Sequence, residues 1–291
     1  MTDRRVSPYM PLATAVLCIS VGSILVRLAQ APPLAIAFHR IFLASLALAP
    51  FAARAAVRSW PLLPARQRWL LLAAGITLAV HFATWIASLA HTTVAASVLL
   101  VNTAPLFTLG FSRVLLGEAP PPVVVTATAL ALVGAALIAA DGWTAGGSSL
   151  YGDGLALAGA ATLSLYHVAG RAFRSALPLS AYVLGVWLAA AATLALVAAG
   201  AGVRLWPYTG RTLAALVLLA LVPTLAGHGL VNRSLRVLPA PTVGLFLLGE
   251  PVAATLLAFA VFGERPGGWT LAGGAFVLAA LALVVAAERG A

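Results

Sequence analysis

The sequence contains no lysine, a single cysteine and very little charge of either sign. Without lysine there is no Walker A motif and no Schiff-base nucleophile, which excludes a P-loop ATPase and covalent catalysis by lysine. The single cysteine, Cys18, can form neither an internal disulfide nor a thiolate metal cluster. Charged residues make up 8% of the chain. Soluble domains carry about 25%, so this chain cannot cover a water-facing surface.

Apolar residues make up most of the chain. They form 62% of the 291 residues, and the mean hydropathy is +1.05. A helix of roughly 20 apolar residues crosses the hydrocarbon core of a bilayer. We therefore predict an all-α integral membrane protein with ten transmembrane helices, near residues 10–28, 32–53, 68–89, 92–112, 119–140, 152–171, 180–200, 211–231, 238–260 and 267–286.

All 17 basic residues are arginine, and the formal net charge is +10. In a soluble protein this excess would suggest nucleic-acid binding, but in a membrane protein it reflects the positive-inside rule. A cytoplasmic N-terminus leaves only Arg27, Arg204, Arg211 and Arg265 outside, because Arg40 lies within a span and the other arginines fall on the cytoplasmic side. We predict a multi-pass protein of the bacterial cytoplasmic membrane with both termini in the cytoplasm.

The chain also contains an internal repeat. Pro105 lies thirteen residues before Glu118, and Pro251 lies thirteen residues before Glu264, so the two pairs share an offset of 146 residues. A Gly/Ser-rich linker at 141–151 separates a first half, 10–140, from a second half, 152–286. Five spans in each half would insert the halves with inverted topology, as in secondary transporters whose substrate site lies at the repeat interface. The alternative is a duplication kept only for packing.

These motifs resemble the drug/metabolite transporter superfamily, in its bacterial form with two EamA domains. The resemblance covers nearly the whole chain. In the first half it rests on residues 26–29 and 33–40, Ala95-Ala96-Ser97-Val98-Leu99-Leu100, Pro105-Leu106-Phe107 and Gly117-Glu118. In the second half it rests on Ala240-Pro241-Thr242-Val243, Gly249-Glu250-Pro251-Val252-Ala253 and Gly263-Glu264. Gly249 departs from the family pattern, which usually has an aliphatic residue there. The resemblance implies two inverted five-helix halves and the export or exchange of small metabolites such as amino acids.

Two ionisable residues fall inside predicted spans, where a charge is costly and usually functional. Arg40 lies in the second span and could bind a substrate carboxylate through its planar fork, or lock the bundle by pairing with a neighbour. Glu250 lies in the ninth span, directly before Pro251. Burial favours the neutral form of a carboxyl group, so Glu250 is a candidate for proton coupling. The alternative for Glu250 is a structural hydrogen bond.

Uncharged polar residues form two stripes. His81, Trp85 and Ser88 share one face of the third span, and His228 and Asn232 share one face of the eighth. The two stripes lie almost one repeat apart and could line a common cavity, although hydrogen bonding between helices is the alternative. Asn102 is a further candidate for the substrate pathway. Tyr166 and His167 are weaker candidates, because aromatic residues also anchor helices at the membrane interface.

Enzyme signatures are missing from the sequence. It has no His-Glu-x-x-His zinc motif, no Gly-x-Ser-x-Gly elbow and no carboxylates paired at helical spacing within a span. We therefore predict that the chain is not an enzyme, holds no metal or cofactor, and does not bind ATP or nucleic acid. Its expected partners are a small-molecule substrate, the lipid bilayer and, through Glu250, protons. The predicted function is metabolite efflux or exchange by alternating access. The alternatives are a scaffold or regulatory subunit that transports nothing and, less favoured, an intramembrane enzyme.

Overall fold

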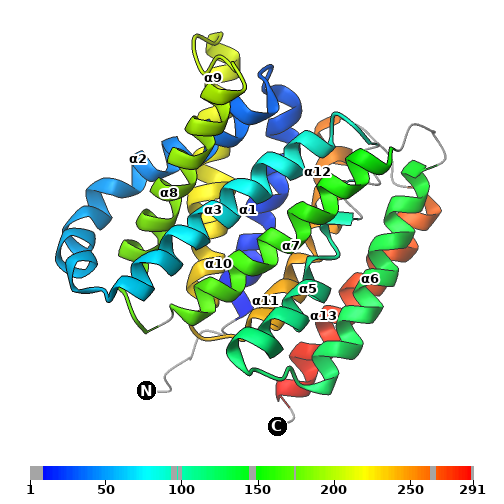
Figure 1. Ribbon diagram of the computed structural model, residues 1–291. Helices are drawn as coiled ribbons and strands as arrows, with labels where there is room; N and C mark the ends of the chain where they lie inside the picture. Colours follow the sequence, from blue (N-terminus) through cyan, green and yellow to red (C-terminus); the bar gives the residue numbers. More distant parts are fainter. Residues whose placement is uncertain are drawn as a thin grey trace, which may run out of the picture.

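The computed structural model describes residues 9–92, 97, 100–143, 149–173, 175–262 and 267–289. Throughout these residues the chain forms helices and connecting turns, without a strand. Figure 1 shows the helices packed as one bundle. Glu264 and the linker residues 144–148 lie outside the described residues.

The helices follow the apolar runs of the sequence. The first half forms α1 (Tyr9–Leu28), α2 (Pro33–Ser59), the short η1 (Trp60–Leu62), α3 (Ala65–Ser88), α5 (Ala104–Phe111), the π-helical η2 (Ser112–Leu116) and α6 (Pro122–Trp143). The second half forms α7 (Leu150–Ala172), α8 (Leu179–Gly200), α9 (Gly210–Leu219), the π-helical η3 (Ala220–His228), α10 (Gly229–Ser234), α11 (Ala240–Leu247), α12 (Glu250–Phe262) and α13 (Gly268–Arg289).

The helices begin at residues that suit an N-terminus. Proline precedes α2, α3, α8 and α11. Proline fixes the backbone and has no N–H group to leave unpaired. Ser149 and Thr209 instead cap α7 and α9, because their hydroxyls accept hydrogen bonds from the amides of Gly152 and Thr212. These six helices therefore begin at a local signal in the sequence.

Seven helical segments are long and apolar enough to cross a membrane: Tyr9–Val26, Pro33–Leu62, Ala65–Ser88, Leu179–Gly200, Gly210–Ser234, Ala240–Val261 and Gly268–Ala287. Two shorter apolar segments, Ala104–Leu116 and Pro122–Leu137, cover parts of the predicted fourth and fifth spans. The predicted sixth span is the helix α7, which is less apolar because it carries Asp153, Ser164 and His167. It packs against α3 and α5. The protein is thus an all-helical, multi-pass membrane protein.

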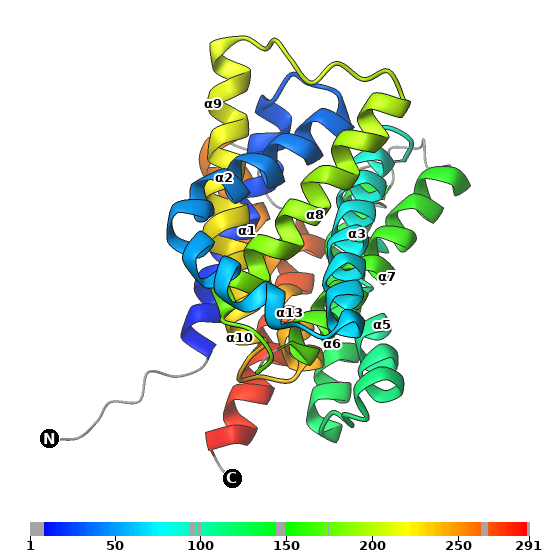
Figure 2. The ribbon, with the colours of Figure 1, turned by 60° about the vertical axis from the view of Figure 1, so that its left-hand side comes forward.

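Contacts between the halves follow a reciprocal pattern. The helix α2 packs against α8, and α6 packs against α13, its counterpart one repeat later. The helix α1 packs against η3 and α12, while the corresponding helix α7 packs against α3 and α5. A two-fold relation between the halves would produce these pairings. Figures 1 and 2 also place the start of α1 and the end of α13 at the same end of the bundle, opposite the α8–α9 connection.

The interface between α1 and η3 is close-packed. A Cβ atom added at Gly227 would lie 2.7 Å from the Cγ1 atom of Ile19, so only glycine allows this approach. A Cβ atom at Gly22 would instead meet the ring of Pro223 at an ordinary 3.6 Å. The first helix of one half is therefore held tightly against the irregular helix of the other.

Candidate functional site

Two helices break at the same position of the repeat. In the second half α11 ends at Leu247, Leu248 and Gly249 form a turn, and α12 begins at Glu250. In the first half the helical state ends at residue 101, residues 102 and 103 form a turn, and α5 begins at residue 104. A proline follows as the second residue of each new helix, Pro105 and Pro251. Interrupted helices at corresponding positions of two halves are characteristic of transporter substrate sites.

The second break is held by a residue of the first half. Pro251 has no N–H group, so it cannot continue the hydrogen-bond ladder of α11. The turn closes through shorter bonds, from the amide of Leu248 to the carbonyl of Leu245 and from the amide of Gly249 to the carbonyl of Phe246, both at 3.0 Å. The hydroxyl of Ser20 on α1 shares its proton between the carbonyl of Val16, at 2.7 Å, and the main-chain oxygen of Glu250, at 3.2 Å. The start of α12 is thus fixed against α1.

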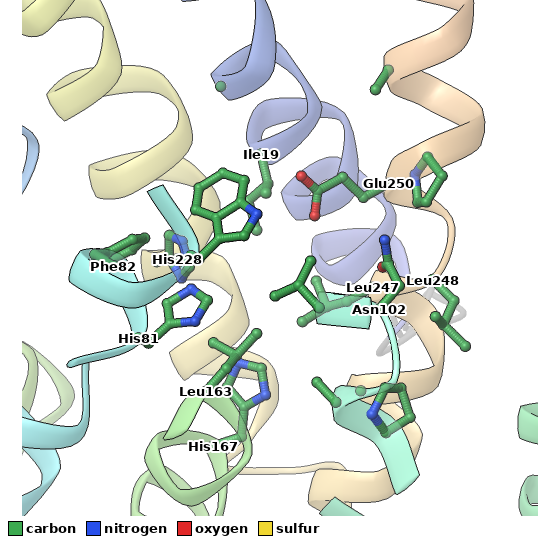
Figure 3. Close-up of a pocket in the computed structure, with 18 of the residues that line it drawn as sticks. Ile19, His81, Phe82, Asn102, Leu163, His167, His228, Leu247, Leu248 and Glu250 are labelled. Atoms are coloured by element: carbon green, nitrogen blue, oxygen red, sulfur yellow. The ribbon is translucent and has the colours of Figure 1, made fainter. Parts of the chain in front are cut away.

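A cavity of about 110 Å³ lies between the two halves. Both helix breaks contribute to its wall, with Val101 and Asn102 from the first and Leu247, Leu248 and Glu250 from the second. Figure 3 shows Asn102 and Glu250 on one side of the cavity and His81, His167 and His228 on the other. The remaining lining is mainly apolar and comes from Ile19, Gly22, Phe82, Ala104, Pro105, Leu163, Gly244, Pro251 and Ala254, together with Arg40 and Trp85.

Arg40 is the buried cation of this cavity. Only 2% of the residue is exposed, and its guanidinium carbon lies 4.1 Å from the centroid of the Phe82 ring. The guanidinium Nε donates to the hydroxyl of Thr224 at 3.2 Å, which is its only hydrogen bond to the described residues. Its terminal nitrogens therefore keep their bidentate donor geometry for a ligand.

Thr224 is positioned by the proline that precedes it. Pro223 lacks the N–H group that would bond the carbonyl of Leu219, four residues earlier. The Thr224 hydroxyl donates to that carbonyl instead, at 2.8 Å, and accepts from Arg40 with a lone pair. This chain of hydrogen bonds connects the irregular helix η3 of the second half to the cation carried by α2 of the first half.

Glu250 supplies the opposite charge without pairing with Arg40. Both residues line the cavity, yet no ion pair joins them, and the Glu250 carboxylate bonds to no other residue that the structure describes. The carboxylate sits in the first turn of α12. Negative charge is favoured there because the helix dipole is positive at its N-terminus. The cavity thus contains a guanidinium group and a carboxyl group that no ion pair joins.

The opposite side of the cavity carries His81, His167 and His228 (Figure 3). Trp85 also lines the cavity. We call these four residues, which supply ring nitrogens, the aromatic wall. The rings of His81 and Trp85 are parallel, with centroids 6.1 Å apart. His81 Nδ1 lies 2.9 Å from the carbonyl of Gly159, and because a carbonyl only accepts, Nδ1 carries the proton. Its Nε2 is then an acceptor in the neutral ring. Trp85 Nε1, His228 Nδ1 and both nitrogens of His167 have no partner in the described part of the chain.

Seven of the ten polar candidates from the sequence line the cavity: Arg40, His81, Trp85, Asn102, His167, His228 and Glu250. Asn232 does not line it. Its side-chain amide donates to the hydroxyl of Tyr166, and to the carbonyl of His228 at 2.8 Å. Ser88 of the predicted stripe bonds to Ser97 at 2.6 Å and is likewise absent from the lining.

Sequence reasoning gave too little weight to two residues. His167, 1% exposed, lines the cavity, and Tyr166 is fully buried beside it, so neither side chain is exposed on the outer surface of the bundle. The helix α7 is enclosed by α3, α5 and α11, which the sequence could not reveal. Thr224 was missed entirely, although its place after a proline within an apolar run was an available signal.

The model of the EamA-like transporter family matches the chain twice, over residues 7–140 and 150–286. The chain belongs to this family. Each matched segment contains one of the two helix breaks, and each contributes residues to the cavity wall. The candidate site of this EamA-like transporter therefore lies where its two repeats meet. Because the chain belongs to this family, it is a membrane transporter of the drug/metabolite type, as the sequence motifs predicted.

A crystal structure of a protein with 24% sequence identity has the same fold, with a TM-score of 0.81 over 97% of this chain and 98% of that chain. No curated protein matches the sequence. The structural likeness extends over the whole EamA-like bundle and so supports its helix arrangement.

Proposed function

We propose that this protein is a secondary transporter that exports or exchanges an amino acid or a related small metabolite across the bacterial cytoplasmic membrane by alternating access. The observation that carries the proposal is the cavity between the repeats, where two broken helices meet Arg40 and Glu250, neither of which forms an ion pair with any described residue. Charges inside a membrane protein are costly unless they serve a ligand or a pathway.

Separate opposite charges favour a zwitterionic substrate. Arg40 would bind a carboxylate through two parallel hydrogen bonds, and Glu250 would accept from an ammonium group. The mainly apolar lining between them suits the carbon skeleton of a small organic molecule. A ligand with only one of these charges would leave the other protein charge without a partner, which is strongly unfavourable in a buried site.

The aromatic wall favours a substrate that also carries a hydrogen-bonding group. Trp85 Nε1 can only donate, while Nε2 of neutral His81 can only accept. A hydroxyl or carboxamide satisfies both kinds of atom, whereas a methyl group satisfies neither. Sites built to bind a hydroxyl discriminate strongly against analogues without it.

Alternating access would use the two-fold relation between the halves. Ten spans in two inverted five-helix repeats, with both termini in the cytoplasm, would let the halves rock around a fixed central cavity. Glu250 is our candidate for coupling transport to protons, because its carboxylate lies in the cavity and is free to exchange a proton when no substrate is bound.

Counterflow in proteoliposomes tests this function. Vesicles with purified protein are loaded with an unlabelled amino acid and offered the same compound with a label outside. We expect transient accumulation that empty vesicles do not show. Arg40→Gln should abolish it, whereas Arg113→Gln, which removes an exposed arginine of the same half, should not. Absence of accumulation for every amino acid, with folded protein, would reject the proposal and favour a membrane scaffold.

Proton coupling needs a separate assay. An imposed pH gradient should drive net uptake in vesicles that contain the wild type. Glu250→Gln should lose this driven uptake and keep counterflow only at a raised substrate concentration, because exchange requires no proton movement but an amide binds an ammonium group less tightly than a carboxylate does. A variant that keeps gradient-driven uptake would exclude Glu250 as the coupling group.

A further inference from the structure

The corner between α2 and α3 carries three exposed arginines that no ion pair engages in the described part of the chain: Arg54 and Arg58 on α2, and Arg66 in the first turn of α3. We call them the basic corner. Arg54 and Arg58 are four residues apart and so share a helix face. Between Asp3 and Glu118 the sequence contains no acidic residue. This segment therefore has no carboxylate of its own to neutralise the basic corner.

Large apolar side chains lie close to these arginines along the chain. Phe51 and Leu62 are each 81% exposed, and Trp69 is 71% exposed. Trp69 lies three residues after Arg66 and so shares its face of α3. An arrangement of guanidinium groups beside exposed aromatic and aliphatic groups matches the boundary between headgroups and acyl chains, where tryptophan is enriched.

The corner is held in place by side chains other than the three arginines. The neighbouring Arg68 donates from Nε to the carbonyl of Leu63 at 2.9 Å and from Nη2 to the carbonyl of Pro61 at 2.8 Å. Trp60 donates from Nε1 to the carbonyl of Ala181 on α8, at 3.2 Å. The turn is thus braced internally, which leaves Arg54, Arg58 and Arg66 available for a ligand.

We infer that the basic corner binds the phosphate group of an anionic phospholipid. Guanidinium groups bind phosphate with two parallel hydrogen bonds and keep their charge at any relevant pH. Clustered arginines beside membrane helices recognise anionic headgroups. A free phosphate ion would leave Phe51, Leu62 and Trp69 without a partner, whereas a lipid covers them with its acyl chains.

The position of this lipid has a consequence for the cavity. The basic corner joins α2, which carries Arg40, to α3, which carries His81 and Trp85. Figure 2 shows this corner at the same end of the bundle as the start of α1 and the end of α13. A headgroup bound across the corner connects the two helices at that end and so restrains their relative movement.

Native mass spectrometry of the detergent-solubilised protein tests the inference. Phosphatidylglycerol and phosphatidylcholine with identical acyl chains are added at equal concentration, and bound lipid is counted. We expect the wild type to retain phosphatidylglycerol at least tenfold better. The triple variant Arg54→Gln, Arg58→Gln, Arg66→Gln should lose this preference, because each arginine near a headgroup contributes about fivefold. The control Arg204→Gln, Arg211→Gln removes exposed arginines near the opposite end and should keep it.

Circular dichroism and gel filtration establish that each variant is folded. A wild type without headgroup preference, or a triple variant that binds as the wild type does, would overturn the inference. Competition by millimolar inorganic phosphate that removes all bound lipid would also overturn it, since the site would then bind phosphate rather than a lipid. Transport activity does not enter this assay, so its outcome is independent of the proposed function.

Discussion

Arg171, in the last turn of α7, donates from Nε to the carboxylate of Glu118 at 2.9 Å and so ties the second half of the chain to the first. The same guanidinium donates from Nη1 to the main-chain oxygens of Leu235 and Arg236, at 3.4 and 3.3 Å. One side chain therefore holds together the end of η2, α7 and the turn between α10 and α11.

Breaking this tie should favour the conformation that is open at that end. In a Cys18→Ala background with the cavity residue Leu163 replaced by cysteine, we expect Glu118→Gln to raise the rate of maleimide labelling about fivefold. The two side chains are only 13% and 25% exposed, and even a surface ion pair contributes up to about 1 kcal/mol, which corresponds to this factor. Glu118→Asp, which keeps the charge, should label nearly as slowly as the parent. Equal rates for all three proteins would show that the pair does not control access.

Thr224 should be essential to the position of Arg40. Thr224→Val keeps the shape of the side chain and removes both hydrogen bonds of the hydroxyl. An unsatisfied buried group costs about 1–3 kcal/mol, so we expect a lower apparent Tm and at least tenfold slower counterflow. Thr224→Ser retains the hydroxyl and should behave almost as the wild type. Normal transport by Thr224→Val would exclude the role of this hydroxyl.

Gly227 and Gly229 provide a matched pair for packing. Gly227→Ala places a methyl group 2.7 Å from Ile19 Cγ1, whereas Gly229→Ala meets nothing within 4 Å. Overpacking costs about 1–3 kcal/mol, so Gly227→Ala should lower the apparent Tm by several degrees. Gly229→Ala should leave it unchanged or raise it. Thermal denaturation in detergent, followed by gel filtration, measures both; equal values would contradict the close approach of α1 and η3.

Trp85 should determine selectivity for polar side chains. Threonine and valine have nearly the same shape, and only threonine has a hydroxyl to meet the indole N–H. We expect the wild type to exchange threonine faster than valine, and Trp85→Phe to reduce that ratio about tenfold, the effect of one hydrogen bond in a buried site. Trp69→Phe, on the exposed side of the same helix, is the control. An unchanged ratio in Trp85→Phe would remove the indole from substrate recognition.

The sequence predicted the family and the apolar helices, and it singled out most of the polar residues that the structure places around the cavity. Arg40 and Glu250 could be recognised because an ionisable residue within an apolar run is conspicuous. Their positions in one cavity could not be predicted, because that depends on how α2 packs against the second half. Pro105 and Pro251 marked the repeat, but the breaks just before them, at Asn102 and Leu248, are visible only in the structure.

Asn232 illustrates where helical periodicity fails as a guide. Spacing correctly put it on the face of His228, but its short side chain bends back to its own helix and to Tyr166 instead of reaching the cavity. The π-helical η3 adds a second difficulty. A π-helix has more residues per turn than an α-helix, so faces assigned with 3.6 residues per turn rotate out of register across Ala220–His228.

The two helix breaks occupy the same position of the repeat, but Ala104 begins one helix and Glu250 begins the other. If identical halves exchanged their conformations, the inward-open and outward-open states would have equal free energies. A carboxylate on one half only removes that equality, because each state then surrounds the charge differently. The inward-open and outward-open states would therefore differ in free energy. Which of them the resting protein prefers would depend on whether Glu250 is protonated or bound to substrate.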